Sequence, residues 1–113
     1  MAIADGLLID ASKDQLGFVS TEHFPGIHLA MTADVFALVD AAVKENPGFS
    51  YTGIWHNILW MSRTSRTKIL GDGHLFRAGI RSKHSIIWQE LKILFHTGDQ
   101  MESCATVMLP SEE

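Results

Sequence analysis

Cysteine, proline and tyrosine are scarce in this sequence of 113 residues, which holds one Cys, three Pro and one Tyr. A single cysteine, Cys104, forms no internal disulfide and fits a reducing compartment. No apolar run approaches the roughly 18 residues that a membrane-spanning helix requires. The first residues reach Asp5 without any cationic segment, so a signal peptide is not expected. Disulfide-rich secreted proteins and helical membrane proteins are therefore excluded, and a cytoplasmic location is expected.

The composition is that of one globular domain. Hydrophobic residues make up 46% of the chain and charged residues 19%, which excludes disordered and collagen-like classes. The length matches a single domain over 1–113 with one small core.

Charge is unevenly distributed along the chain. Residues 1–62 hold two basic and seven acidic residues, for a net charge of −5. Residues 63–98 hold seven basic and two acidic residues, for +5, and residues 99–113 hold four acidic residues and no basic one, for −4. The three segments sum to the net charge of −4. Such segmentation bears on binding partners and not on the fold.

The first part of the chain predicts two short strands around a loop. Residues 7–10 and 27–31 are apolar or alternate at period two, which predicts strands. Residues 12–17 predict one helical turn that begins at Ser12 and ends at Gly17, and residues 18–26 predict a loop.

Two helices are predicted in the middle of the chain. The first spans about 33–45, with Thr32 as its N-cap and Asn46-Pro47-Gly48 after its end. The second begins near Thr52 and ends at Gly71-Asp72-Gly73, so that the cations at 63, 66 and 68 occupy its last turns.

Three strands are predicted in the C-terminal part, over 74–80, 85–96 and 104–109. Residues 85–96 also fit a helix, but their β-branched and aromatic content favours a strand. Arg77 and Arg81 alternate with apolar residues and are expected on the opposite face of their strand. The predicted fold class is α+β, with two central helices packed on a three-stranded antiparallel C-terminal sheet.

Three sequence blocks resemble a family of small proteins of unknown function that plasmids and phages carry. The blocks are Ile3-Ala4-Asp5-Gly6-Leu7-Leu8-Ile9-Asp10, then Ile58-Leu59-Trp60-Met61, then Val107-Met108-Leu109-Pro110 before an acidic end. They occur in order and span most of the chain. The resemblance implies a mobile-element origin and carries over no catalytic residue.

Metal and thiol chemistry are not expected. His23, His28 and His56 could converge on a zinc ion, but their spacing does not require it, and zinc motifs are absent from the sequence. In a hairpin that turns at Asp99-Gln100, His96 is expected opposite Ser103, so that Cys104 faces away from it and is a core residue. We therefore predict no catalytic residue, no metal and no cofactor.

Basic and aromatic residues are the candidate binding groups. The cations of the 63–83 segment would merge into one patch if the second helix and the next strand pack together; they are Arg63, Arg66, Lys68, Arg77, Arg81 and Lys83. Trp60 lies on a different helix face from Trp55 and is expected as an exposed interface anchor. The alternatives are that the chain's own carboxylates pair with these cations, and that the sheet or a homodimer covers Trp60.

Three functional hypotheses follow. The first is a non-enzymatic interaction protein that binds a host protein or ribonucleoprotein complex; with the resemblance, it becomes an inhibitor of a bacterial defence system of the anti-CRISPR type. The second is a nucleic-acid-binding accessory protein of a plasmid or phage that uses the basic 63–83 segment. The third is a small enzyme that uses a metal.

Overall fold

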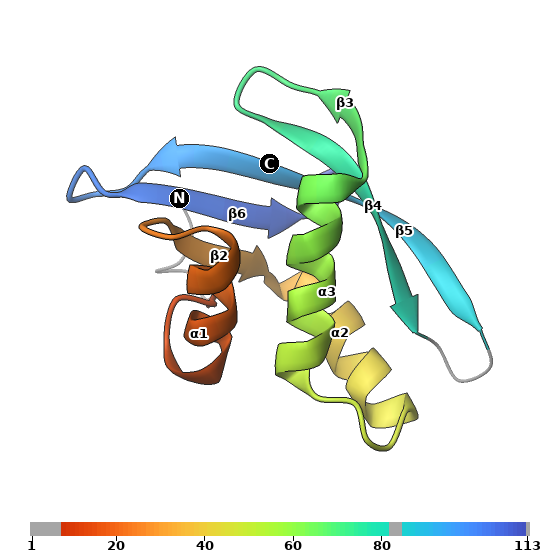
Figure 1. Cartoon of the computed structure of the whole chain (residues 1–113). Helices are drawn as coiled ribbons and strands as arrows, with labels where there is room; N and C mark the ends of the chain where they lie inside the picture. The colour runs from red at the N-terminus through yellow and green to blue at the C-terminus, as the bar shows by residue number, and fades with distance from the viewer. Residues whose placement is uncertain (1–7, 82–84, 113) are drawn as a thin grey trace.

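The computed structural model describes residues 8–81 and 85–112, and within them the chain forms three helices and one six-stranded mixed sheet (Figure 1). The helices are α1 (Asp14–His23), α2 (Ala33–Glu45) and α3 (Tyr51–Thr64). The strands are β1 (Leu8–Asp10), β2 (His28–Thr32), β3 (Arg66–Ile69), β4 (Gly73–Arg81), β5 (Ile86–Thr97) and β6 (Ser103–Met108). The α+β class is confirmed, and both predicted helices and the antiparallel C-terminal strands are present, but a third helix and three further strands were not part of the predicted architecture.

The sheet contains strands from both ends of the chain, in the order β1-β2-β6-β5-β4-β3. The C-terminal strands β4, β5 and β6 form the predicted antiparallel meander. Strand β2 then adds to β6 in parallel, with His28 beside Cys104, and β1 pairs antiparallel with β2. The meander is therefore half of a larger sheet, because the two N-terminal strands and β3 extend it on both sides.

The helices form a layer on one side of this sheet, as Figure 1 shows. The core lies between the layers, where Trp55 of α3 and Phe76 of β4 are fully buried. Side chains alternate along β4, with Phe76 and Ala78 buried and Arg77 exposed, as the sequence predicted. No helix in the described part of the chain is long and apolar enough to cross a bilayer. The opposite face of the sheet carries Arg77 and, on β5, Trp88.

Helix α1 is longer than predicted and continues through Gly17 to His23. A β-carbon at Gly17 would lie 2.8 Å from the carbonyl oxygen of Ser12, so the glycine allows close backbone approach and does not end the helix. The predicted loop over 18–26 is therefore wrong over 18–23, which are helical, and confirmed over 24–26.

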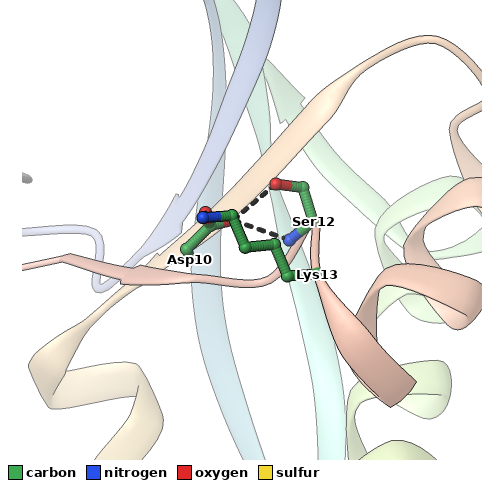
Figure 2. A network of polar contacts seen from close by, with 3 residues as sticks. All are labelled: Asp10, Ser12 and Lys13. Atoms are coloured by element: carbon green, nitrogen blue, oxygen red, sulfur yellow. Dashed lines mark hydrogen bonds and ion pairs between the residues drawn. The ribbon is translucent and has the colours of Figure 1, made fainter.

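Asp10 organises the connection between β1 and α1, which Figure 2 shows from close by. Its carboxylate accepts the backbone N–H of Ser12 at 2.8 Å and also the Ser12 hydroxyl, and Lys13 lies 3.8 Å from it. Desolvation acts to raise the pKa of Asp10, but the hydrogen bonds from Ser12 outweigh it and the pKa is lowered.

The two longer helices differ in how well their starts were predicted. Thr32 caps α2 as expected, because its hydroxyl accepts the backbone N–H of Val35 at 3.3 Å. Helix α3 is capped by Ser50 and not by Thr52, since the Ser50 hydroxyl accepts the backbone N–H of Gly53 at 3.1 Å.

The structure differs most from the prediction at the end of α3. The helix stops at Thr64, and Arg66–Ile69 form strand β3, which pairs antiparallel with β4. Gly71-Asp72-Gly73 is therefore a hairpin turn and not a helix end. Arg66 and Lys68 lie on a strand, and only Arg63 occupies the last turn of the helix.

Candidate binding surface

The cations of the basic segment are exposed and lie outside the ion pairs of the described residues. Four of the predicted cations have described side chains, and all are exposed: Arg63, Arg66, Lys68 and Arg77. The ion pairs among the described residues join Lys13 to Asp10 at 3.8 Å and Lys44 to Asp40 at 2.8 Å. Within the described chain, the positive charge of the 63–77 segment is therefore available to a partner.

Two of these cations share a surface hollow of about 380 Å³ with an indole. Arg66 of β3, Arg77 of β4 and Trp88 of β5 line it, together with Ser65 and Thr67. The backbone N–H of Arg77 donates to the carbonyl of Ser65 at 3.2 Å, which holds the start of β3 against β4. The hairpin formed by β3 and β4 thus brings Arg66 close to Arg77, although eleven positions separate them in the sequence.

Trp88 is held against the backbone of β4 and is still 54% exposed. It lies opposite Gly79 in the β4–β5 register. A β-carbon at Gly79 would lie 3.2 and 3.3 Å from Cζ3 and Cη2 of Trp88, so the missing side chain makes room for the indole. The guanidinium carbon of Arg77 lies 5.5 Å from the centre of the indole ring, within cation–π range. The side chain of Trp88 is therefore positioned and at the same time accessible.

Arg63 lies in a different hollow, of about 360 Å³, between α1 and α3. His23, His56 and Trp60 line it with Arg63 and Glu22. Trp60 is 49% exposed, which confirms the expected exposed indole on α3. Trp60 and Arg63 therefore lie in one hollow, and Arg66 and Arg77 in another.

The two histidines of this hollow form a direct hydrogen bond. His23 Nε2 lies 2.8 Å from His56 Nδ1, and Arg63 Nη1 lies 3.3 Å from His23 Nδ1. Because arginine only donates hydrogen bonds, His23 Nδ1 is the acceptor of the bond from Arg63. His23 Nε2 therefore carries the hydrogen and donates it in the hydrogen bond to His56 Nδ1. Burial lowers the pKa of His23, and the neighbouring His56 and Arg63 lower it further. The carboxylate of Glu22 acts in the opposite direction and raises this pKa, but by less.

The remaining predicted cations lie on or beyond these strands. Lys68 is exposed on β3, with Leu75 as its neighbour on β4. Arg81 is the last residue of β4, and its side chain lies outside the described residues, as does Lys83.

Cys104 and His96 are direct cross-strand neighbours, which corrects the predicted register. His96 bonds through Nε2 to the Thr106 hydroxyl at 3.0 Å, while Cys104 Sγ lies 3.7 Å from the Glu102 carbonyl. Desolvation, followed by the carboxylates of Glu102 and Asp99, raises the pKa of the thiol. A raised pKa disfavours the thiolate that a nucleophilic cysteine requires.

Neither the metal-ligating side chains of the described residues nor the comparison with known proteins adds a candidate site. Among the described residues, no group of three or more His, Cys, Asp or Glu side chains is placed to hold a metal ion. No family model, no curated protein and no solved structure matches this chain.

Trp88 is the site residue that sequence reasoning missed. Its position opposite Gly79 depends on the β4–β5 register, and its closeness to Arg66 depends on β3, which was predicted as helix. The signal that could have found it is the alternation of Thr67 and Ile69 before a Gly-Asp-Gly turn, which is typical of a hairpin.

Proposed function

We propose that this protein is a non-enzymatic binding protein that docks on a negatively charged host protein or ribonucleoprotein complex. The docking surface is centred on the hollow between Arg66, Arg77 and Trp88. The observation that carries the proposal is that two exposed guanidiniums line one hollow with a half-exposed indole, on the sheet face opposite the described helices. Arginine and tryptophan are the residue types that dominate the energetics of binding surfaces.

The chemistry of the hollow supports binding more than catalysis. A guanidinium stays protonated in proteins, so neither Arg66 nor Arg77 can take up a proton from a substrate. Both can donate two hydrogen bonds to one carboxylate or phosphate.

The charge distribution supports a partner with a defined orientation. Helices α1 and α2 carry five acidic residues against the single basic residue Lys44; the acidic ones are Asp14, Glu22, Asp34, Asp40 and Glu45. The cations of β3 and β4 lie on other elements of the fold. An acidic partner is therefore attracted to the hollow and repelled by the α1–α2 side.

Inhibition of a bacterial defence system of the anti-CRISPR type is the narrower form of this proposal. It is supported by the resemblance to plasmid- and phage-borne proteins, which implies a bacterial host and its cytoplasm. In that setting the protein would act sterically, by occupying a surface that an effector or a nucleic acid requires.

The test is capture of a complex from bacterial lysate by the tagged full chain, with the bound proteins and nucleic acids identified. The variant Arg66→Glu/Arg77→Glu reverses two charges in the hollow and should lose the captured complex. Because Arg77 lies opposite Glu90 on β5, circular dichroism checks that the variant still folds. Capture should also weaken as salt rises, because exposed charge pairs are screened.

The matched control is Lys13→Glu/Lys44→Glu, which reverses the same charge at exposed lysines outside the hollow. It should retain the complex. Capture that survives reversal of both arginines would overturn the proposal, as would equal loss in the two double variants.

A further inference from the structure

We infer that the hollow between Arg66, Arg77 and Trp88 binds single-stranded nucleic acid, with a base stacked on Trp88 and phosphates held by the two arginines. The inference rests on the proposed docking surface and names the part of the partner that it contacts.

The indole is presented as a stacking platform. One side of Trp88 packs against the β4 backbone at Gly79, where a β-carbon would lie within 3.3 Å of the ring, and 54% of the residue remains exposed. A ring fixed from one side loses little conformational freedom when a base stacks on it. Every unpaired base offers a π-face to such a ring, whereas in a duplex these faces are already stacked.

The cations beside the indole have the chemistry that a strand backbone requires. Arg77 lies 5.5 Å from the ring centre, and Arg66 lines the same hollow from β3. Their guanidiniums can hold phosphate oxygens in two hydrogen bonds each, and Ser65 and Thr67 line the hollow with them.

The size and surroundings of the hollow fit one nucleotide of a passing strand. Its volume of about 380 Å³ is near the lower limit of the roughly 300–1,000 Å³ typical of small-ligand pockets. In the described part of the sheet, Glu90 of β5 is the acidic residue paired with Arg77, and no ion pair between them is present. The arginine charge therefore remains free to meet a phosphate.

The experiment is fluorescence anisotropy with labelled oligo(dT) and oligo(U) of about 12 nucleotides, within the site size of single-strand binders. Two competitors accompany them, a DNA duplex of the same length and poly-glutamate, which carries charge without bases. We expect the single strands to bind and both competitors to bind at least tenfold more weakly. Between about 50 and 200 mM salt the affinity for the single strand should fall.

The decisive variants change the ring and keep the charge. Trp88→Leu should weaken binding by about 5- to 150-fold, the range for loss of one stacked base, and Trp88→Tyr should restore most of it. Phe18→Leu changes an exposed aromatic residue of α1 outside both hollows and should leave the affinity within about twofold. Circular dichroism and melting temperature check that each variant folds.

The outcomes separate this inference from the proposed function. The single-strand inference is overturned if poly-glutamate or duplex binds as tightly as the single strands, or if Trp88→Leu leaves the affinity unchanged. If charge reversal at Arg66 and Arg77 still abolishes capture from lysate in that case, the docking surface stands, with an acidic protein as its partner. Absence of oligonucleotide binding at about 50 mM salt also overturns the inference.

Discussion

Trp55 and Ser20 form a buried hydrogen bond between α3 and α1, in which the indole Nε1–H donates to the serine hydroxyl at 2.9 Å. The hydroxyl in turn donates to the carbonyl of Ala11 at 2.7 Å. Trp55 is fully buried and Ser20 is 1% exposed, so water cannot replace either bond. This chain of two hydrogen bonds therefore connects the largest core side chain to the segment before α1.

Replacing Ser20 by Ala should destabilise the protein by about 1–3 kcal/mol, because it leaves the indole N–H of Trp55 buried without a partner. Urea unfolding followed by circular dichroism gives the free energy of unfolding. In a double-mutant cycle with Trp55→Phe, the two losses should sum to more than the loss in the double variant. Strict additivity would show that the bond contributes nothing to stability.

The helices and strands that the sequence predicted well are those whose signals are local. Thr32 and the apolar spacing after it located α2 correctly. Alternation of apolar and polar residues located β4, and β-branched and aromatic content located β5. Local signals failed at Gly17 and at the 63–70 segment. Glycine is typical of a helix end, but Gly17 lies within α1 and allows close backbone packing. Cations at 66 and 68 are typical of the last turn of a helix, but these residues belong to β3, which pairs with β4.

The candidate site depended on pairings that no local signal contains. The sequence predicted Arg66 and Arg77 as binding residues, and in the structure both line one hollow. It could not place Trp88 beside them, because that neighbourhood requires the registers of two hairpins at once. The parallel pairing of β2 with β6 could not be predicted either, because it joins residues far apart in the sequence, near positions 28 and 104.

The burial of His23 next to His56 and Arg63 should make stability depend on pH, because it lowers the pKa of His23. The pKa of His23 lies below its ordinary value of 6.5, so the unfolded chain binds more protons than the folded one as pH falls past that value. The free energy of unfolding should therefore decrease between about pH 7 and pH 5. Protonation of His23 at Nδ1 sets an N–H against the Arg63 guanidinium.

His23→Gln should flatten the pH dependence over this range, measured as unfolding free energy at several pH values. The control is His28→Gln, which replaces an exposed histidine of β2 and should leave the slope unchanged. A slope that is the same in all three proteins would refute the role of the histidine pair.

Gly73 and Gly71 lie two positions apart in the β3–β4 turn, and only Gly73 should be sensitive to replacement by alanine. A β-carbon at Gly73 would lie 1.9 Å from the carbonyl oxygen of Ile93, which is backbone and cannot move aside cheaply. At Gly71 no atom lies within 4 Å of that position. Gly73→Ala should lower the unfolding free energy by about 1–3 kcal/mol, and Gly71→Ala should change it by about 0.5 kcal/mol or less. Equal melting temperatures would contradict the close approach of β4 and β5.

Thr32 joins the start of α2 to the end of the chain through one hydroxyl. The hydroxyl accepts the backbone N–H of Val35 at 3.3 Å and donates to the carboxylate of Glu112 at 2.8 Å. The same carboxylate oxygen accepts the backbone N–H of Leu109 at 2.8 Å, and Lys92 donates to the carbonyl of Pro110 at 3.2 Å. The C-terminal turn is thus bonded to a helix cap.

Thr32→Val keeps the shape of the side chain but removes both hydrogen bonds, and we expect a loss of about 1–3 kcal/mol of unfolding free energy. Thr32→Ser keeps the hydroxyl and should lose less than about 1 kcal/mol. Glu112→Ala should speed hydrogen exchange at the Leu109 amide and leave the Val35 amide protected, because the cap accepts that N–H without the carboxylate. If Thr32→Val and Thr32→Ser are equally stable, the hydroxyl does not make this connection.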